Sequence, residues 1–401
     1  MGGLPTASRR FTQPFVGPVK EFSSELRLES FGNSFFDWAF GGYYYDRTAR
    51  QLSIVGNGPE QRAKSLNNIN EEEATQKSVF ALTSFHLTRT LELEAQGRWT
   101  WEDKSAILTN ALPAVPVVRS PAADFSYGTY RLTGSWRWLD DNTLYAVVAS
   151  GTKSGGFNNT VILSEQSFGP EKNTTFEIGS KNQLFNRTLT LNASAYYIDW
   201  SNLQLPVPSA VAGQVNFVRN IGSATVKGFE IFAAARPVEN LDVSLGYSYT
   251  DPKWKKGTID FSSARACATP AACGRTPLGG GIDIGGFQIP RTSRHQLTAA
   301  GTFTIPLQDS ELYIRGDASY RSSQVTLSAI ALQRVPAQTL VNGRVGWVKE
   351  NHEISLFVKN AFDKSYIISS INEPEFFPVT TFTTGFLGNG RIIGLTLETG
   401  F

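Results

Sequence analysis

A long period-two alternation of side chains is the feature that most constrains what this chain can fold into. Residues 188–200 read TLTLNASAYYIDW and residues 310–321 read SELYIRGDASYR. In both segments every second side chain is apolar or small, and most of the intervening ones are polar. The segment 390–401, GRIIGLTLETGF, repeats the pattern. Alternation over ten or more residues predicts long β-strands with one apolar face, and no helical period of comparable strength competes with it.

The predicted strands are too long for an ordinary globular sheet. Strands of globular proteins usually run about 5–6 residues, whereas the alternating segments here run about 10–13. Fifteen of them are predicted, at 22–30, 35–45, 78–87, 91–102, 126–137, 143–152, 173–184, 188–200, 223–236, 240–250, 292–305, 310–321, 338–348, 351–360 and 390–401.

The predicted connections alternate between short and long. The short ones lie at 139–142, 185–187, 237–239, 307–309 and 349–350. Long segments rich in Gly, Pro, Asn and Ser separate them, and such composition is typical of loops. These long loops are expected at 46–77, 103–125, 153–172, 201–222, 251–291, 322–337 and 361–389. One rim of the sheet is therefore expected to carry tight turns and the other rim large loops.

The two faces of these strands favour a membrane setting over a dry core. A transmembrane β-barrel turns its apolar face to lipid and its polar face to the lumen. Ten residues at about 3.3 Å each, tilted by about 45°, span about 25 Å, which matches the apolar band of an outer membrane. Aromatic residues near strand ends suit the interfacial girdles of such barrels, although core aromatics are the alternative. The aromatic residues concerned are Tyr43, Tyr44, Tyr45, Trp99, Trp101, Trp136, Trp138, Tyr197, Trp200 and Trp347.

Composition excludes several other classes of protein. Lys plus Arg (37) nearly balances Asp plus Glu (35), which argues against a nucleic-acid binder. Two Cys and three scattered His do not supply a multi-cysteine or His-rich metal site. No catalytic or phosphate-binding motif is present, so no catalytic residue, metal or cofactor is predicted. No apolar run of about 18 residues predicts a transmembrane helix, and the first twenty residues lack the apolar core of a signal peptide.

Several stretches together resemble a known family. They include LYAVVASGTKSGGFN (144–158), the hairpin at 171–204, NIGSATVKGFEI (220–231) and VKNAFDKSY (358–366), with FSSELRLES (22–30) at the start and GRIIGLTLETGF at the end. In combination they resemble the β-barrel of TonB-dependent outer-membrane receptors. The resemblance covers residues 22–401, which we interpret as a partial receptor barrel. Residues 1–21 are expected to form an irregular leader or a truncated loop.

The resemblance implies an all-β transmembrane antiparallel barrel in the outer membrane of a Gram-negative bacterium, with short periplasmic turns and long extracellular loops. It implies a receptor, not an enzyme, that imports a scarce ligand such as an iron–siderophore complex, a vitamin or a saccharide. In this family a plug domain fills the lumen and a segment before it engages the TonB system. Outer-membrane lipid and the barrel-assembly machinery are the other implied partners.

The sequence departs from the family pattern in its strand number. About 15–16 long strands are predicted, against 22 in the family barrel, and neither a plug nor a TonB-binding segment is recognisable. In an antiparallel meander of fifteen strands the first and last run the same way, so they cannot close antiparallel. We therefore interpret the chain as the C-terminal portion of a receptor. A passive porin-like channel is the alternative, and a soluble all-β binding module is a further one.

Loop residues are the candidates for ligand contact, with loop packing as the competing interpretation. The candidates are Lys153, Phe157, Asn158, Trp200, Asn202, Phe217, Arg219, Phe376, Phe377 and Phe386. Cys267 and Cys273 close a small loop, CATPAAC, and are expected to form a disulfide in an oxidising envelope compartment, the alternative being two free thiols. The terminal Phe401 resembles the aromatic assembly signal of the family's barrels.

Overall fold

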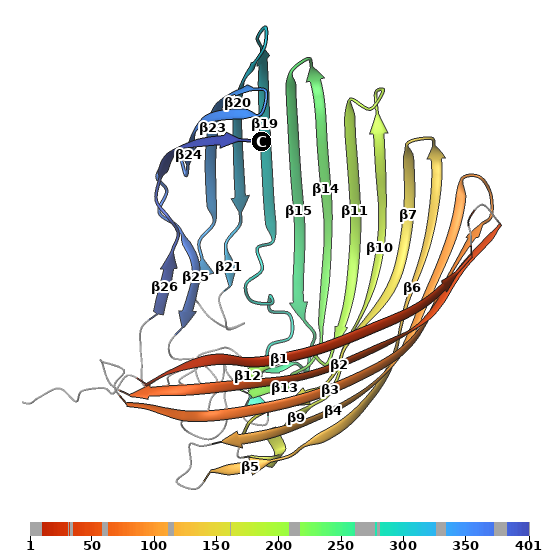
Figure 1. Cartoon of the computed structure of the whole chain (residues 1–401), viewed down its shortest axis with the longest axis vertical. Helices are drawn as coiled ribbons and strands as arrows, with labels where there is room; N and C mark the ends of the chain where they lie inside the picture. The colour runs from red at the N-terminus through yellow and green to blue at the C-terminus, as the bar shows by residue number, and fades with distance from the viewer. Residues whose placement is uncertain are drawn as a thin grey trace, which may run out of the picture.

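One large antiparallel sheet forms the body of the protein. The structure is a computed structural model, and it describes residues 10–30, 32, 35–57, 63–110, 116–160, 162–207, 217–260, 277–278, 281–325, 334–372 and 383–400. Fifteen strands pair in strict sequence order, and the short β5 (Val117–Arg119) pairs at the side of β4 (Figure 1). The fifteen are β1 (Arg10–Glu29), β2 (Phe36–Asn57), β3 (Ala63–His86), β4 (Leu91–Asn110), β6 (Ala122–Leu139), β7 (Asn142–Lys153), β10 (Glu171–Leu184), β11 (Leu189–Ser201), β14 (Ala224–Val238), β15 (Leu241–Trp254), β19 (His295–Pro306), β20 (Glu311–Arg321), β23 (Gln338–Lys349), β24 (His352–Lys359) and β27 (Ile392–Thr399).

The strand number is confirmed, and so is the alternation of short and long connections from β3 onward. Each of the fifteen predicted segments overlaps one strand of the sheet. Tight turns join the hairpins at one edge, here named the turn rim, and the long connections gather at the opposite edge, named the loop rim (Figure 1). Within the long connections lie β8 (Gly156–Phe157), η1 (Leu163–Glu165), β9 (Ser167–Phe168), β12 (Gln204–Val207), β13 (Phe217–Asn220), β16 (Ile259–Asp260), β17 (Pro277–Leu278), β18 (Gly281–Asp283), β21 (Gln324–Val325), β22 (Arg334–Val335), β25 (Ile367–Asn372) and β26 (Thr383–Leu387).

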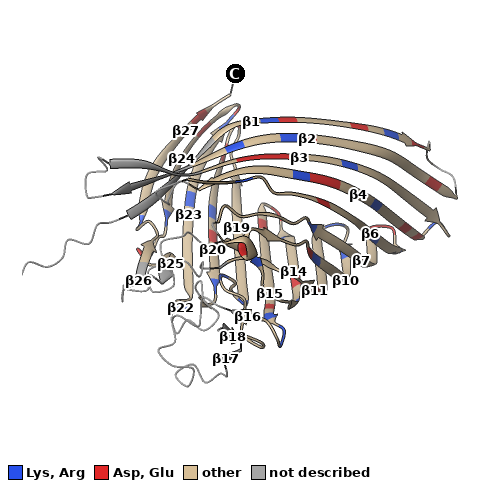
Figure 2. Ribbon diagram, turned by 90° about the horizontal axis from the view of Figure 1, so that it is seen from below, with Lys and Arg blue, Asp and Glu red and all other residues tan. Residues whose placement is uncertain are grey.

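The first four strands are longer than predicted, which corrects three expectations. Most of the loop expected at 46–77 is strand, because β2 runs to Asn57 and β3 begins at Ala63. Part of the loop expected at 103–125 is strand as well, because β4 runs to Asn110 and β6 begins at Ala122. The irregular leader expected at 1–21 is strand from Arg10 onward. The many charged residues here are typical of loops, but in the structure they lie on paired strands (Figure 2). The ion pair between Arg50 Nε and Glu71 Oε1, at 3.0 Å, is one example.

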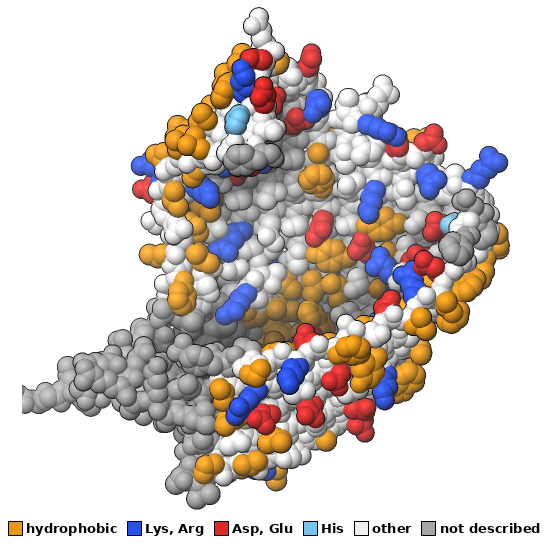
Figure 3. Space-filling model, in the orientation of Figure 1, with side chains coloured by type: hydrophobic (Ala, Val, Ile, Leu, Met, Phe, Trp, Pro, Cys, Tyr) orange, Lys and Arg blue, Asp and Glu red, His pale blue; other side chains and the backbone are white. Residues whose placement is uncertain are grey.

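The two faces of the sheet differ as the alternation predicts. Ile178, Ile314 and Leu395 are 64%, 51% and 64% exposed and lie on the outer, convex face. The concave face carries polar and charged groups such as Glu177 and Lys181, and Figure 3 shows acidic and basic side chains spread over it. The apolar faces of the strands therefore do not meet one another in a dry interior, as expected for a barrel wall facing lipid.

The aromatic girdle is present with three corrections. Trp99, Trp101 and Trp136 lie on the outer face and are 47%, 47% and 51% exposed. Tyr43, whose ring faces Arg98, and Tyr45, which shares its phase, belong to the concave face. Trp200 packs against a buried cluster at the loop rim. A strand position near the loop rim therefore did not by itself predict which face an aromatic residue would take.

The sheet has two edge strands in the part of the chain that is described. β1 and β27 end the ladder path, and both run from the loop rim to the turn rim, because fourteen antiparallel steps separate them. Unpaired edges of this kind are costly in lipid, since bilayer hydrocarbon offers no hydrogen-bond partners. Among the described residues, no helix has the length and apolar character needed to cross a membrane.

Candidate functional site

A small hydrophobic core fixes the loops at the loop rim. Leu203, Phe217 and Ile221 from one connection pack with Trp254 and Ile284, and all five are buried. Trp200 packs against this cluster and donates its Nε1–H to Glu171 Oε1 at 2.9 Å. Ile284 comes from the connection 255–294 and Trp254 from the end of β15, so the core joins the loops that follow β11 and β15. The loop rim is therefore a packed layer with a defined shape.

The Asn158 side chain joins two loops at the loop rim. Its amide Nδ2 donates to the carbonyl oxygens of Glu165, at 2.9 Å, and Val218, at 2.8 Å. Its Oδ1 accepts from the Val218 backbone N–H at 2.8 Å. Asn158 is buried, so these bonds satisfy both ends of an amide that would otherwise lack partners. The loop 154–170 is thereby fixed to β13.

Neighbouring side-chain amides add further ties to the same loop. Asn220 Oδ1 accepts from the Gly169 N–H at 2.7 Å, and its Nδ2 donates to the Gly169 carbonyl at 2.9 Å. Asn159 Nδ2 donates to Asn70 Oδ1 at 2.6 Å and to the Thr109 carbonyl at 3.0 Å. Asn158 and Asn159 therefore reach different neighbours. The loop 154–170 therefore connects β3 and β4 with β13.

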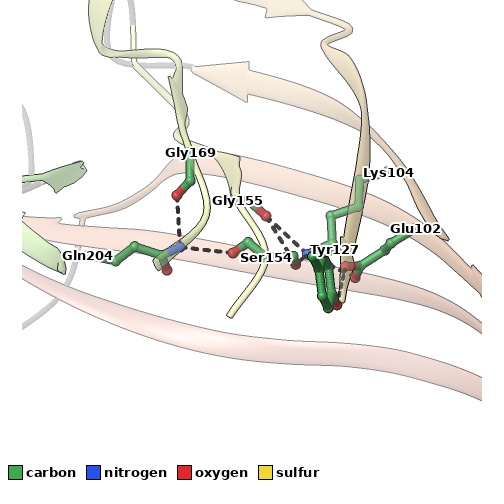
Figure 4. A network of polar contacts seen from close by, with 7 residues as sticks. All are labelled: Glu102, Lys104, Tyr127, Ser154, Gly155, Gly169 and Gln204. Carbon is green, nitrogen blue, oxygen red and sulfur yellow. Dashed lines mark hydrogen bonds and ion pairs between the residues drawn. The ribbon is translucent and has the colours of Figure 1, made fainter. Parts of the chain in front are cut away.

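An ion pair on the concave face lies beside this loop (Figure 4). Lys104 Nζ lies 3.1 Å from Glu102 Oε1, and their side chains are only 23% and 12% exposed. Lys104 also donates to the hydroxyl of Ser154 and, at 3.0 Å, to the carbonyl of Gly155. Tyr127 donates its hydroxyl to Glu102 Oε2 at 3.2 Å. The pair thus anchors the start of the loop to β4.

Gln204 completes the network drawn in Figure 4 from the other side. Its Nε2 donates to the carbonyls of Ser154, at 2.8 Å, and Gly169, at 3.0 Å. Both ends of the loop 154–170 are therefore held by one side chain of β12. Gly155 sits where a Cβ would overlap the Phe168 carbonyl and the Phe125 ring, so the backbone can approach this closely only with glycine.

The concave wall below the loops carries tyrosine–carboxylate pairs. Tyr145 donates its hydroxyl to Glu177 Oε1 at 2.6 Å, and Tyr313 donates to Glu353 Oε1. Asn342 Nδ2 donates to Asp317 Oδ2 at 2.7 Å. The first and third pairs join adjacent strands, whereas Tyr313 of β20 reaches across β23 to Glu353 of β24. Together they present hydroxyls, carboxylates and amides to the hollow of the sheet (Figure 3). Such a wall is suited to contact a polar partner or an aqueous path.

The structure brings together only part of the predicted set of ligand-contact residues. Asn158, Trp200 and Phe217 meet at the loop rim, where hydrogen bonds and packing fully engage Asn158 and Phe217. Exposed side chains in the set are those of Lys153, Asn202, Arg219 and, at 50%, Phe386. Phe157 is half-buried in β8. Phe386 lies apart on β26, in the connection after β24.

Five of the predicted residues lie outside the described part of the chain. These are Phe376, Phe377, Cys267, Cys273 and Phe401. The disulfide and the assembly signal therefore stay predictions.

Sequence reasoning missed the residues that organise the loop rim. Glu102, Lys104, Asn159, Gln204 and Asn220 read as ordinary polar residues of strands and loops. One signal was available: the run Lys-Ser-Gly-Gly-Phe-Asn-Asn at 153–159 places two glycines and two amides side by side. Asn158 reaches Val218, 60 residues away, and Asn159 reaches Thr109, 50 residues away, so only the fold identifies these partners.

Comparison with protein families gives one match that spans most of the chain. Residues 3–361 match the family described as TonB dependent receptor-like, beta-barrel. A curated relative, the probable TonB-dependent siderophore receptor PiuA of Acinetobacter baumannii, is 23% identical over 324 residues. That alignment covers 77% of this chain and 40% of the relative.

Solved structures share the fold at low sequence identity. The ferric yersiniabactin uptake receptor FyuA from Yersinia pestis superposes with a TM-score of 0.77 at 17% identity, over 98% of this chain and 57% of that one. The siderophore receptor PiuA from Acinetobacter baumannii gives a TM-score of 0.73 at 17% identity, over 97% and 56% of the two chains. The chain therefore spans between two fifths and three fifths of the length of these proteins.

Proposed function

Because the chain belongs to the TonB-dependent receptor-like β-barrel family, we propose that it serves in the import of a scarce ligand across the outer membrane, with an iron–siderophore complex as the leading cargo. Barrels of this family are outer-membrane proteins of Gram-negative bacteria, and the family consists of receptors and transporters. The observation that carries the proposal is the family match over residues 3–361. The siderophore cargo is supported by the relatives, which are described as siderophore receptors and as a ferric yersiniabactin uptake receptor.

The asymmetry of the two rims supports a receptor that captures its ligand outside the cell. The tight turns at the turn rim present little surface for contact with a ligand, and this rim would face the periplasm. The loop rim carries packed connections with exposed side chains such as Lys153, Arg219 and Phe386. We propose that these three, with Asn202, contact the ligand, while Asn158 and Phe217 hold the loops in shape.

The TonB system and a closing element are the proposed partners. The family works with TonB, and energised import would need it. Since both edge strands run toward the turn rim, closing the sheet takes an odd number of further antiparallel strands. The seven strands that separate fifteen from the family's 22 satisfy that parity. The proposal also includes a plug-like segment against the concave wall and insertion by the barrel-assembly machinery. The barrel domain expected over 22–401 is extended to include all of β1, from Arg10 onward.

Uptake of labelled iron in the native bacterium tests the proposal. A clean deletion of the gene is grown under iron limitation and supplied with ferric hydroxamate, ferric catecholate or ferric citrate labelled with radioactive iron. We expect uptake of one of the three to fall to the background of a protonophore-treated culture, and to return when the gene is restored. Unchanged uptake of all three would remove siderophores from the proposed cargo.

The porin-like alternative predicts a different result in the same strain. A passive pore would admit small solutes down their gradients, so its contribution would persist in the presence of the protonophore. Loss of protonophore-sensitive uptake therefore supports the receptor, and loss of protonophore-resistant uptake supports the pore.

A further inference from the structure

Two arginines lie directly opposite each other on the concave wall. Arg315 of β20 is the cross-strand partner of Arg344 of β23, and both share the phase of the pair formed by Asp317 and Asn342. Side chains in such positions have Cβ atoms about 4.5–5.5 Å apart, and like charges there destabilise the strand pair. The arrangement therefore calls for negative charge between the two guanidinium groups.

The carboxylates nearby supply only part of that charge. Arg344 Nη1 lies 3.6 Å from Glu353 Oε1, an oxygen that already accepts a tyrosine hydroxyl. In the part of the chain that the structure describes, Arg315 forms no ion pair, and its Nη1 donates to Thr302 Oγ1 at 3.4 Å. Asp317 accepts from the side-chain amide of its neighbour on β23. Arg315 is thus the less compensated member of the arginine pair.

A third cation extends the cluster onto the next strand. Phe357 of β24 lies opposite Arg344, and the Arg344 Cζ atom lies 5.8 Å from the centre of its ring. Lys359 Nζ lies 5.6 Å from the centre of the same ring, and Lys359 is exposed. A cation beside the face of an aromatic ring is attracted by it, so the ring holds both cations near one another. Three cations therefore lie on three adjacent strands.

These cations line a hollow of about 570 Å³ in the wall, here named the arginine hollow. The residues that line it include Arg315, Arg344, Lys359, Phe357, Asp317 and Glu311. Its three cations thus face two carboxylates. The volume falls within the range of about 300–1,000 Å³ that is usual for small-molecule sites.

The arginine hollow is separate from the loop residues assigned to cargo contact. Arg315 precedes Arg321, the loop-rim end of β20, by six residues, which is about 20 Å along a strand. The hollow is formed by the wall alone, so a ligand there does not depend on the proposed cargo or on the loop rim.

We propose that the arginine hollow binds a small polycarboxylate anion, either free or as the chelator of a metal ion. Planar guanidinium groups bind carboxylates through paired, charge-assisted N–H···O bonds, and a carboxylate between the two arginines would remove their repulsion. Strands about 4.8 Å apart spread the three cations over about 10 Å, which is wider than one phosphate or one carboxylate. A molecule with two or three carboxylates can place one between Arg315 and Arg344 and another beside Lys359.

Calorimetric titration of the full chain in detergent micelles tests the proposal. Citrate, ferric citrate, inorganic phosphate and the neutral triamide of citrate are compared in a buffer free of other oxyanions. Citrate should bind at least about tenfold more tightly than the triamide or phosphate. Equal affinity for citrate and the triamide would overturn the proposal, and so would tighter binding of phosphate. Tighter binding of ferric citrate than of citrate supports the metal complex as the natural ligand, and the reverse order supports the free anion.

A matched pair of variants locates the site. Arg315→Gln should weaken citrate at least about tenfold, because it removes a guanidinium without depriving a described carboxylate of its ion pair. In the absence of citrate its Tm should equal or exceed that of the wild type, since the repulsion with Arg344 is relieved. The control is Arg131→Gln. Arg131 also lines the concave face and donates to a threonine hydroxyl at 3.4 Å, but it lies opposite Gln96.

The control variant should bind citrate as the wild type does and should gain no stability. Equal losses of affinity in the two variants would contradict the assignment, and so would a lower Tm of Arg315→Gln without citrate. Heat-modifiable gel mobility checks that each variant folds. Should Arg315→Gln fail to fold, Lys359→Gln must weaken citrate binding, and unchanged affinity in that variant would overturn the proposal.

Discussion

The ring of Tyr145 covers Gly179 across the β7–β10 pair, so a Cβ built on this glycine would overlap the phenol. The same side chain then reaches Glu177 two residues earlier on β10. Tyr196 covers Gly228 and Tyr313 covers Gly346 in the same manner. An aromatic ring over a cross-strand glycine shields backbone that would otherwise be bare, and it fixes the register of the two strands.

Gly179→Ala should therefore destabilise the sheet. The added methyl group moves the Tyr145 ring away and breaks its bond to Glu177, at a cost of about 1–3 kcal/mol. The matched control is Gly316→Ala, since a Cβ there meets nothing within 4 Å. Urea unfolding of the detergent-solubilised protein measures both. Equal stability of the two variants would contradict the role assigned to the ring.

Asn158→Asp should loosen the loop 154–170. The change keeps the shape of the side chain but replaces an amide that donates to two carbonyls with an acceptor that repels them. A buried group left without its partners costs about 1–3 kcal/mol, and more if it is charged. Limited proteolysis should show faster cleavage within 154–170. The exposed Asn351→Asp, at the turn rim, should show the wild-type digestion pattern.

Lys104→Met should destabilise the protein where Lys104 joins the loop 154–170 to β4. Glu102 would lose its ion pair while only 12% exposed, and Ser154 and Gly155 would lose a donor. The expected loss in stability is about 1–3 kcal/mol. A double-mutant cycle with Glu102→Gln should recover part of this loss, since the uncompensated carboxylate is then gone. Additive effects of the two changes would show that the pair is not coupled.

Phe217→Ala and Phe386→Ala should separate loop packing from ligand contact. Phe217 is buried in the loop-rim core, so its truncation should cost about 3–5 kcal/mol. Phe386 is 50% exposed, so its truncation should change stability by no more than about 0.5 kcal/mol. If Phe386 touches the cargo, its variant loses affinity at unchanged stability. Comparable unfolding midpoints for the two variants would contradict the assignment.

The Asp141–Arg187 pair at the turn rim should make stability depend on pH in a defined direction. Arg187 donates to both carboxylate oxygens, at 3.0 and 2.8 Å, and holds the pKa of Asp141 below its usual value. The pair's contribution is complete above about pH 4, the unfolded pKa, and is lost as pH falls through the lower folded pKa. The difference in Tm between wild type and Arg187→Gln should therefore be constant at neutral pH and shrink in acid. A difference that grows in acid would contradict this sign.

Much of the fold followed from the sequence because strand alternation is a local property. Segments such as 188–200 and 310–321 predicted both the strand and the side of the sheet on which each residue lies. The error at 46–77 arose because charged residues read as loop, whereas Arg50 and Glu71 neutralise each other across β2 and β3. Local composition cannot show a partner that lies twenty residues away.

The candidate site was less predictable for the same reason. Lys153, Arg219 and Phe386 were identified as loop residues and are exposed at the loop rim. The hydrogen bonds that hold the loop 154–170 in place were not identified from the sequence. The bonds of Asn158 to Val218 and of Lys104 to Gly155 connect residues 60 and 51 positions apart. Such contacts form only after the strands have paired in the sheet.

The shared direction of β1 and β27 limits what can complete the sheet. Two copies inserted the same way into one bilayer would bring together edges that both run toward the periplasm, and such edges could join only in parallel. Parallel pairing is slightly less stable per residue than antiparallel pairing. The shared direction of the two edge strands thus disfavours pairing between two copies of this sheet. It favours closure by a different segment, whose first and last strands run from the turn rim to the loop rim.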